Sequence, residues 1–312
     1  MAKVCIMGCG AMGSVYAGLM AAAGHEVHAV TPWQDHVDAI NAHGLRVSGF
    51  SGDRTVRLAS ASIHANDVGP CDLVIIATKA FDVETAARGV KPLMKSDTVV
   101  QTIQNGVGSA DRVARYVDPA QLAVGVVGGY GASLPEPGHA HHNGLAVTWF
   151  GAYAGLPQKD LEASAEIWRS SGFEVALHED VSSMVWKKVI MNVAYSGTSG
   201  LTELTIGQII DHPEAWRIAS GCAQEAVDVS RKLGIELGLP DPIAHVRELG
   251  GKIPDARPSM LLDLLAGRRC EVDAINGAIV RIGGERDVPT PINDVVVALI
   301  RAKEAGVVQR GG

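Results

Sequence analysis

The chain has 312 residues, of which 47% are hydrophobic and 20% charged, proportions typical of a globular protein and atypical of a disordered one. The formal net charge is −7 and the pI is about 5.9. Lysine and arginine form no cluster, so we expect no nucleic-acid partner. No apolar run reaches the roughly 18–20 residues that a membrane span needs, and we expect no signal peptide and no membrane partner.

The cysteine pattern indicates a reducing compartment. The number of cysteines is odd, they are scattered, and none forms a C-x-x-C pair, which disfavours both a disulfide framework and a zinc site. We therefore expect a cytoplasmic protein. The cysteines are Cys5, Cys9, Cys71, Cys222 and Cys270.

The N-terminal residues predict a strand–turn–helix–strand unit. Residues 3–7 are a short apolar run typical of a buried parallel strand. After Gly13, an apolar stretch through Leu19 to Ala23 has helical spacing. Gly24 stands where a helix should end, and residues 26–30 predict the next strand. The unit has about the length of a βαβ motif.

Further strands are predicted at residues 56–58, 73–77, 98–103 and 122–127, followed by a β-rich stretch to about Gly155, a helix over 159–171 and a strand over 174–177. After about residue 180 only helices are predicted, over 182–195, 215–233, 242–249, 260–265 and 272–282. The sequence thus predicts an α/β protein: an N-terminal Rossmann-type doubly wound sheet (residues 1–179) followed by an all-helical C-terminal domain (180–312). An active site is expected in the cleft between them.

A G-x-G-x-x-G motif joins the first strand to the first helix, the context in which this motif binds a dinucleotide. Gly8 permits the tight turn, Gly10 lets the backbone approach a pyrophosphate, and Gly13 lets helix and strand pack closely. The helix N-terminus supplies N–H groups for the phosphates. Cys9 is interpreted as a small filler, with the alternative that the helix N-terminus lowers its pKa. The expected cofactor-binding loop is Gly8, Cys9, Gly10, Ala11, Met12 and Gly13.

The choice between NAD and NADP is open at this point. An NAD site usually places Asp or Glu at the end of the second strand, and an NADP site places Arg nearby. In the stretch from Val30 to Asp35 neither kind of side chain stands at the expected position. Arg46 or Arg54 folding back toward this position is an alternative.

Six short segments then point to one family. They are Thr78-Lys79-Ala80, Gln104-Asn105-Gly106, Pro137-Gly138 with His142 and Gly144, Trp186-Lys187-Lys188 with Asn192, Ser259-Met260-Leu261 with Asp263, and residues 271–277, which begin with Glu271. In their order and spacing the chain resembles the ketopantoate reductase (2-dehydropantoate 2-reductase) family over nearly its full length.

The resemblance implies reduction of the 2-keto acid ketopantoate to pantoate, a step of pantothenate biosynthesis, with NADP as the family cofactor and NAD as the alternative. We expect the protein to assemble as a homodimer. Implied catalytic residues are Lys188 as general acid, Glu271 at the substrate hydroxyl and Asn105. Implied substrate-binding residues are Asn192, Ser196 and Ser259, and Lys79 and Asn105 are expected near the nicotinamide.

The chain departs from the family pattern at two places. Ser196 stands where the family often has a second Asn, eight residues after the lysine, and a hydroxyl is shorter and offers fewer donors than an amide. Pro32 and Trp33 stand where NADP-dependent members commonly carry Arg. These departures concern the substrate and the cofactor rather than the type of reaction.

The residues themselves support this chemistry. Reduction of a keto acid needs a proton at the carbonyl oxygen, and a cationic acid there stabilises the developing charge. Lys188 fits if burial brings its pKa nearer to neutrality. Asn192 and Ser196 follow at four-residue steps and therefore share its helix face.

Each of these residues also has a plainer interpretation. In this interpretation the helix stripe is a solvated face, Lys79 is a lysine at the end of a strand, and Asn105 is a turn residue. Glu271, which lies in the charged stretch 268–271, would belong to a surface ion pair. Residues 139–142 contain three histidines, but alternation along a strand would put His139 and His141 on one face and His142 on the other, so we expect no metal site.

Three hypotheses follow from the sequence. The first is a 2-keto acid reductase acting on ketopantoate. The second is a dehydrogenase for another D-2-hydroxy acid, with NAD as a cofactor candidate, motivated by Ser196 and by Pro32 and Trp33. The third, a non-catalytic dinucleotide-binding sensor, predicts loss of Lys188, Asn192 or Glu271, and all three are present.

Overall fold

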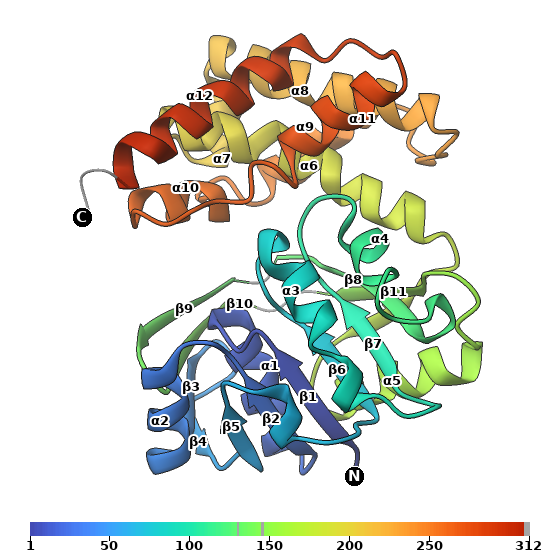
Figure 1. The fold of residues 1–312 in the computed structure, drawn as a ribbon. Coiled ribbons are helices and arrows are strands. Elements are labelled where there is room, and N and C mark those ends of the chain that lie inside the picture. Colours follow the sequence, from blue (N-terminus) through green and yellow to red (C-terminus); the bar gives the residue numbers. More distant parts are fainter. Residues whose placement is uncertain (130, 145–146, 309–312) are drawn as a thin grey trace. The chain divides into compact units, whose positions relative to one another are not determined.

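The computed structural model describes residues 1–129, 131–144 and 147–308 (Figure 1). The chain divides into two compact units. The first unit comprises Met1–Gln104 and Ser109–Val181, and the second comprises Asn105–Gly108 and Ser182–Gly312. Residues 105–108, although they lie between two segments of the first unit in sequence, therefore belong to the helical second unit.

An eight-stranded sheet forms the centre of the first unit, with the order β5-β2-β1-β6-β7-β8-β11-β12. The first six strands are parallel, and their order is the 3-2-1-4-5-6 order of the Rossmann fold. β11 is antiparallel to β8 and parallel to β12. The predicted fold class is confirmed. The strands are β1 (Lys3–Met7), β2 (Glu26–Val30), β5 (Ser60–Ser62), β6 (Leu73–Ile76), β7 (Val99–Thr102), β8 (Leu122–Val127), β11 (Thr148–Ala152) and β12 (Val175–Leu177).

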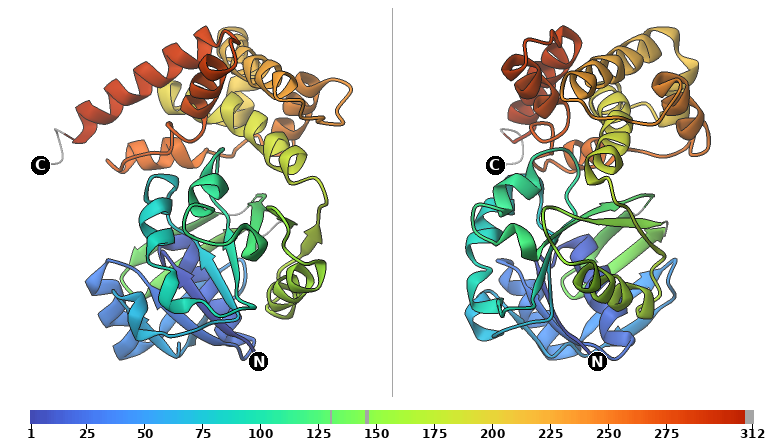
Figure 2. Two further views of the ribbon diagram at one scale, coloured as in Figure 1. Left: turned by 45° about the vertical axis from the view of Figure 1, so that its right-hand side comes forward. Right: turned by 90° about the vertical axis from the view of Figure 1, so that its right-hand side faces the viewer.

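Both faces of this sheet are covered by helices, as the views in Figure 2 show. α1 (Ala11–Ala22) and α5 (Gln158–Ser170) pack on one face, and α3 (Val83–Arg88) and α4 (Ser109–Val113) pack on the other. Alternate residues of β1 supply the two cores: Val4 and Ile6 face the first pair of helices, Cys5 and Met7 the second. This explains why the strand is a continuous apolar run.

A smaller sheet with the order β4-β3-β10-β9 also belongs to the first unit, and α1 contacts it as well as the large sheet. The strand predicted at 56–58 is wrong in its bounds, because β4 ends at Val56. The sequence also missed β3 and β5, which are short and contain polar residues, so no apolar run marks them. The elements are β3 (Leu45–Gly49), β4 (Arg54–Val56), β9 (Gly131–Glu136), β10 (His139–Gly144), α2 (Gln34–His43) and the short 3-10 helices Ala65–Asp67, Ala80–Asp82, Lys91–Leu93 and Pro119–Gln121.

In the second unit every regular element of the described residues is helical. The helix predicted over 272–282 is wrong at its start: residues 271–275 form turns, in which the N–H groups of Ala274 and Ile275 both donate to the Glu271 carbonyl. The helices are α6 (Val181–Thr202), α7 (Ile206–Asp211), α8 (Pro213–Lys232), α9 (Pro242–Gly251), α10 (Ser259–Leu265), α11 (Asn276–Glu285) and α12 (Pro291–Val308).

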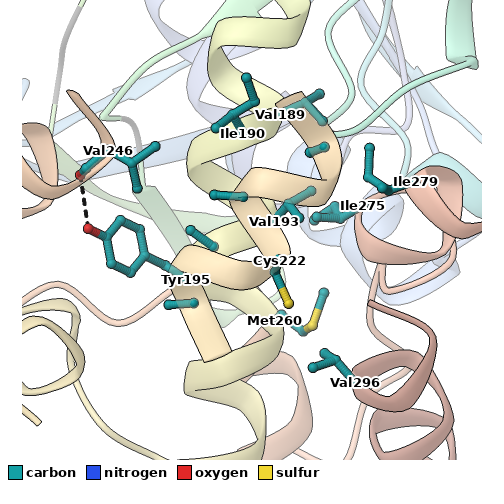
Figure 3. Close-up of a cluster of buried hydrophobic side chains, with 14 of the residues drawn as sticks. Val189, Ile190, Val193, Tyr195, Cys222, Val246, Met260, Ile275, Ile279 and Val296 are labelled. Atoms are coloured by element: carbon teal, nitrogen blue, oxygen red, sulfur yellow. Dashed lines mark hydrogen bonds between the residues drawn. The ribbon is translucent and has the colours of Figure 1, made fainter. Parts of the chain in front are cut away.

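Helix α6 lies at the centre of the second unit's core (Figure 3). The same cluster contains buried side chains from the six other helices of the unit, among them Cys222 of α8 and Val296 of α12. The Tyr195 hydroxyl of α6 donates a 2.9 Å hydrogen bond to the Val246 carbonyl of α9. Packing on several sides fixes both the position and the rotation of α6, so the polar side chains that it carries are held in defined directions.

None of the described helices is long and apolar enough to span a membrane. The five cysteines are buried thiols without a disulfide.

Candidate active site

The glycine loop has the geometry that a pyrophosphate requires. Gly8 has φ +94°, and a Cβ there would lie 2.5 Å from Thr78 Cγ2. A Cβ on Gly13 would lie 2.5 Å from the Gly8 carbonyl oxygen, whereas a Cβ on Gly10 would meet no atom within 4 Å. The fold thus leaves no room for a side chain at Gly8 or Gly13, whereas Gly10 has open space beside its backbone. The residues present fit a dinucleotide.

Helix α1 adds the electrostatic part of this loop. Its N-cap is Gly10, no side chain caps it, and its first turn contains no acidic residue. Its first N–H groups and the positive end of its dipole are therefore available to a phosphate.

On the other side of β1, the chain after β6 approaches the glycine loop. Thr78 contacts Gly8 closely, and Lys79 follows as the N-cap of a 3-10 helix. Gln104 Nε2 donates to the carbonyl oxygens of Ile76 and Thr78 at 2.6 and 3.2 Å. Lys79 therefore stands at the switch point between β1 and β6, where ligands of open α/β sheets bind.

A series of buried hydrogen bonds connects the glycine loop to His36, and sequence patterns did not predict it. Gly138 N–H donates to His36 Nδ1 (2.9 Å), and His36 Nε2 lies 3.0 Å from Ser14 Oγ. Because Nδ1 accepts, Nε2 carries the proton and donates to Ser14. Ser14 Oγ lies 3.4 Å from Cys9 Sγ. No sequence motif marks His36, whose partners are 22 and 102 residues away.

Cys9 has a raised, not a lowered, pKa. Burial raises the pKa of its thiol to about 11, and the hydrogen bond to Ser14 offsets this only in part. The direction of this shift is opposite to the alternative of a thiol activated by the helix N-terminus, because burial disfavours the charged thiolate.

The end of β2 presents an aromatic ring instead of a charged side chain. Trp33 is 38% exposed and stacks on His36 with ring centroids 5.1 Å apart and planes 9° apart. Arg46 donates to Asp53 at 2.6 and 3.0 Å, and Arg54 donates to the Ser51 carbonyl. Both arginines thus have partners within the β3–β4 region.

In the helical unit, Lys188 and Glu271 form the electrostatic centre. Burial lowers the pKa of Lys188 to about 8, and the negative charge of Glu271 opposes this shift. Glu271 lies in the turn before α11 and is only 7% exposed. The alternative of a surface ion pair is wrong, because Glu271 is buried. Arg268, the first residue of the same charged stretch, pairs with Asp263 at 3.0 Å.

The segment 105–108 joins this centre. Asn192 Nδ2, one turn after Lys188 on α6, donates to Asn105 Oδ1 at 3.5 Å. Val107 N–H donates to the Ala274 carbonyl at 3.0 Å. Gly106 has φ +88°, and a Cβ there would lie 1.9 Å from that carbonyl oxygen. Asn105 is therefore held against α6 and against the turn that carries Glu271.

The remaining sequence-predicted residues differ in exposure. Ser196 continues the Lys188–Asn192 stripe along α6 and is 4% exposed, whereas Ser259, the first residue of α10, is exposed. The structure thus brings Lys188, Glu271, Asn105 and Asn192 together in the helical unit. The glycine loop and Lys79 belong to the sheet unit.

The three histidines of β10 alternate as predicted. His139 Nε2 and His141 Nδ1 lie 2.7 and 3.1 Å from Ser48 Oγ, while the buried His142 packs against Phe50. In the part of the chain that the structure describes, no three His, Cys, Asp or Glu side chains are grouped as metal ligands would be.

A Rossmann sheet with this glycine loop, combined with a helical unit that presents a lysine of lowered pKa, defines the class of nicotinamide-dependent oxidoreductases. Comparison with known families then identifies the family within this class. The family model described as "Ketopantoate reductase PanE/ApbA" matches residues 4–155, and its "C terminal" companion matches residues 180–304. The chain belongs to the ketopantoate reductase family.

Individual relatives agree over the full length. The 2-dehydropantoate 2-reductase of Archaeoglobus fulgidus is 32% identical over 307 residues, covering 98% of this chain and 99% of the relative. A crystal structure of a PanE/ApbA family ketopantoate reductase from Ralstonia eutropha is 33% identical, with TM-score 0.88 and coverage of 98% and 99%. The ternary structure of D-mandelate dehydrogenase with NADH and anilino(oxo)acetate is 27% identical, with TM-score 0.90 and the same coverage.

Proposed function

We propose that this protein reduces a 2-keto acid to the 2-hydroxy acid with a nicotinamide dinucleotide, and that 2-dehydropantoate is its first candidate substrate. The observation that carries the proposal is Lys188, whose pKa burial lowers to about 8 beside Glu271. Such a lysine is still largely protonated at pH 7 and gives up its proton more readily than a lysine in water.

The reaction divides between the cofactor and the protein. A bound reduced nicotinamide supplies hydride to the carbonyl carbon. The Lys188 ammonium donates a proton to the carbonyl oxygen, so that keto acid, reduced dinucleotide and one proton give hydroxy acid and oxidised dinucleotide. Because negative charge develops on that oxygen, the ammonium stabilises the transition state more than the ground state.

The neighbouring groups orient the reactants. Glu271 helps to keep Lys188 protonated and would accept a hydrogen bond from the hydroxyl of the product. Asn192 donates to Asn105 Oδ1, which leaves the Asn105 amide N–H groups to face substrate or the nicotinamide. Asn192 and Ser259 would bind the substrate, and the glycine loop with Lys79 would hold the dinucleotide.

A second candidate is an NAD-dependent dehydrogenase for a D-2-hydroxy acid with a larger apolar side chain. Ser196 offers a hydroxyl where the family often has an amide, on the helix stripe that would face the substrate. Trp33 stands where a 2′-phosphate would need a cation. The structural similarity to D-mandelate dehydrogenase solved with NADH also supports this second candidate.

A panel of 2-keto acids, from ketopantoate to phenylglyoxylate, assayed with NADH and with NADPH by nicotinamide absorbance, tests both candidates. Preference for ketopantoate supports the first, and preference for an aromatic or branched keto acid supports the second. Dinucleotide binding without turnover of any member of the panel would overturn both and favour a binding protein without catalysis.

A further inference from the structure

We infer that three buried residues of the helical unit, Glu225, Asn293 and Asn276, form a hydrogen-bonded chain that positions Lys188 relative to Glu271. Asn276 is the residue through which this chain acts on the site. The catalytic part of the inference rests on the proposed function, whereas the positioning of Lys188 can be measured without turnover.

The hydrogen-bonded chain begins with the carboxylate of Glu225, which lies on α8 and caps the N-terminus of another helix, α12. Glu225 of α8 accepts three hydrogen bonds at the start of α12: from Ile292 N to Oε1 (2.8 Å), and from Asn293 N and Asn293 Nδ2 to Oε2 (2.9 and 2.6 Å). A carboxylate at a helix N-terminus is stabilised both by free N–H groups and by the dipole. Glu225 therefore fixes the first turn of α12 to α8.

The same carboxylate fixes the direction of the Asn293 amide. Asn293 Nδ2 donates to Glu225 and to the Cys222 carbonyl (3.1 Å), so Asn293 Oδ1 must face the other way. There it accepts a 2.9 Å hydrogen bond from Asn276 Nδ2. Each donor and acceptor in this hydrogen-bonded chain is fixed by the one before it. The charge of Glu225 therefore determines the orientation of the Asn276 amide.

Asn276 then connects the two elements that carry the electrostatic centre. Its Nδ2 also donates to the Val193 carbonyl of α6 at 3.0 Å, and Val193 follows Asn192 directly. Asn276 itself is the first residue of α11, directly after the turns that begin at Glu271. One side-chain amide thus ties the helix of Lys188 to the turn of Glu271.

The close approach between Asn276 and α6 depends on Gly197. A Cβ there would lie 3.2 Å from Asn276 Oδ1 and 2.4 Å from Val296 Cγ1. Asn276 Oδ1 is buried and has no hydrogen-bond partner among the described residues. A buried amide with an unsatisfied oxygen costs free energy that an apolar residue would not. The directional hydrogen bond from Asn276 to α6 is an interaction that an apolar residue could not make.

Asn276→Ala tests the inference, with Gln101→Ala as the matched control. Gln101 is also a fully buried amide: its Oε1 accepts from Trp168, and its Nε2 has no partner among the described residues. It belongs to the sheet unit, whereas Lys188 belongs to the helical unit. Both variants should lower the melting temperature. Only Asn276→Ala should lower kcat, by at least roughly tenfold, since small misplacements of catalytic groups have effects of this size.

The pH dependence separates positioning from general destabilisation. Burial has a larger effect on the pKa of Lys188 than the charge of Glu271 does. Looser packing around Lys188 in Asn276→Ala should therefore raise this pKa and move the basic limb of the kcat–pH profile to higher pH. Gln101→Ala should leave this limb in place. Glu225→Gln, which keeps the shape and removes the charge, should move the limb in the same direction by less. If Asn276→Ala does not fold, Glu225→Gln decides. Folded variants with an unchanged limb and near-normal kcat would overturn the inference.

Titration of Lys188 by NMR in protein carrying ¹³C-labelled lysine, assigned with Lys188→Arg, gives a readout independent of turnover. A wild type that reduces no keto acid would end the proposed function. In that case an altered Lys188 titration in Asn276→Ala would still support the positioning chain, and an unaltered one would refute it.

Discussion

Asn192 Nδ2 donates to Asn105 Oδ1 across 3.5 Å, although the two residues are 87 positions apart in the sequence. Asn192 is on the central helix of the second unit, and Asn105 follows the last residue of the sheet unit before the chain crosses over. The contact is long for a hydrogen bond, as catalytic contacts often are before substrate binds. It joins to α6, one turn after Lys188, an amide that sequence order alone would assign to the other unit.

Replacing Lys188 with alanine should lower kcat by about a hundredfold or more, the scale of a positioned general acid. Dinucleotide affinity should change little, because the glycine loop belongs to the other unit. Lys187→Ala is the matched control, since Lys187 is the adjacent lysine on α6. Steady-state kinetics and a dinucleotide titration measure the two quantities. Normal turnover in Lys188→Ala would transfer the role of acid to another residue, with Lys79 the next candidate.

The pH profile should follow the pKa of Lys188, about 8. Reduction needs the protonated amine, so kcat for the keto acid should fall as pH rises through about 8. Oxidation of the hydroxy acid needs the neutral amine and should rise over the same range. Glu271 raises the pKa of Lys188, so Glu271→Gln should move the limb to lower pH. A limb that moves upward in this variant would contradict the assigned interaction.

Two glycines of the phosphate loop should respond differently to alanine. Gly10→Ala adds a methyl group where the structure has open space, so stability should hold while dinucleotide affinity falls. In Gly13→Ala the methyl group would lie 2.5 Å from the Gly8 carbonyl oxygen, and the protein should be destabilised by about 1–3 kcal/mol, the usual effect of overpacking. Thermal unfolding and calorimetric titration distinguish these outcomes. Unchanged affinity in Gly10→Ala would show that the pyrophosphate does not pass this residue.

Ser196→Asn should increase kcat/KM for ketopantoate and leave kcat/KM for an apolar keto acid unchanged or lower. A site that hydrogen-bonds a substrate group discriminates strongly through that bond, whereas a lost methylene contact is worth only about 1–3 kcal/mol. Ser196→Ala serves as the control, because it removes the hydroxyl without adding an amide. Equal effects on both substrates would show that position 196 does not contact the substrate side chain.

Discrimination between NADH and NADPH should be below about a hundredfold in kcat/KM, or under roughly 2.7 kcal/mol. Residues 31–34 offer neither a carboxylate to repel a 2′-phosphate nor a cation to bind it, and Arg46 is paired with Asp53. Trp33→Arg should shift the ratio toward NADPH. A wild-type preference of several thousandfold would reveal a residue that reads the 2′ position and that neither sequence nor structure indicates.

The sequence predicted what local patterns encode. The glycine loop, the apolar strands and the histidine alternation of β10 each depend on neighbouring residues, and the structure confirms them. Sequence patterns could not predict contacts that join distant segments. The arginines beside Glu271 suggested a surface pair, yet Arg268 pairs with Asp263, and the burial of Glu271 depends on the fold. The start of α11 at Asn276 depends likewise on partners in α6 and α12.

Some missed features did carry a local signal. Thr205 and Gln208 form a capping box at the start of α7, a pattern visible in the sequence. Short strands such as β5 carry none, because their residues are small and polar and the neighbouring strand alone determines them.

The crossing of residues 105–108 into the helical unit has a consequence for recombination between homologues. A chimera joined only near residue 181 would bring a foreign Asn105–Gly108 segment to the native Ala274 carbonyl, where a Cβ at position 106 has no room. Exchange of halves should therefore succeed when the incoming segment keeps glycine at 106 and an amide at 105. These four residues are inherited with one half of the chain and must remain compatible with the other.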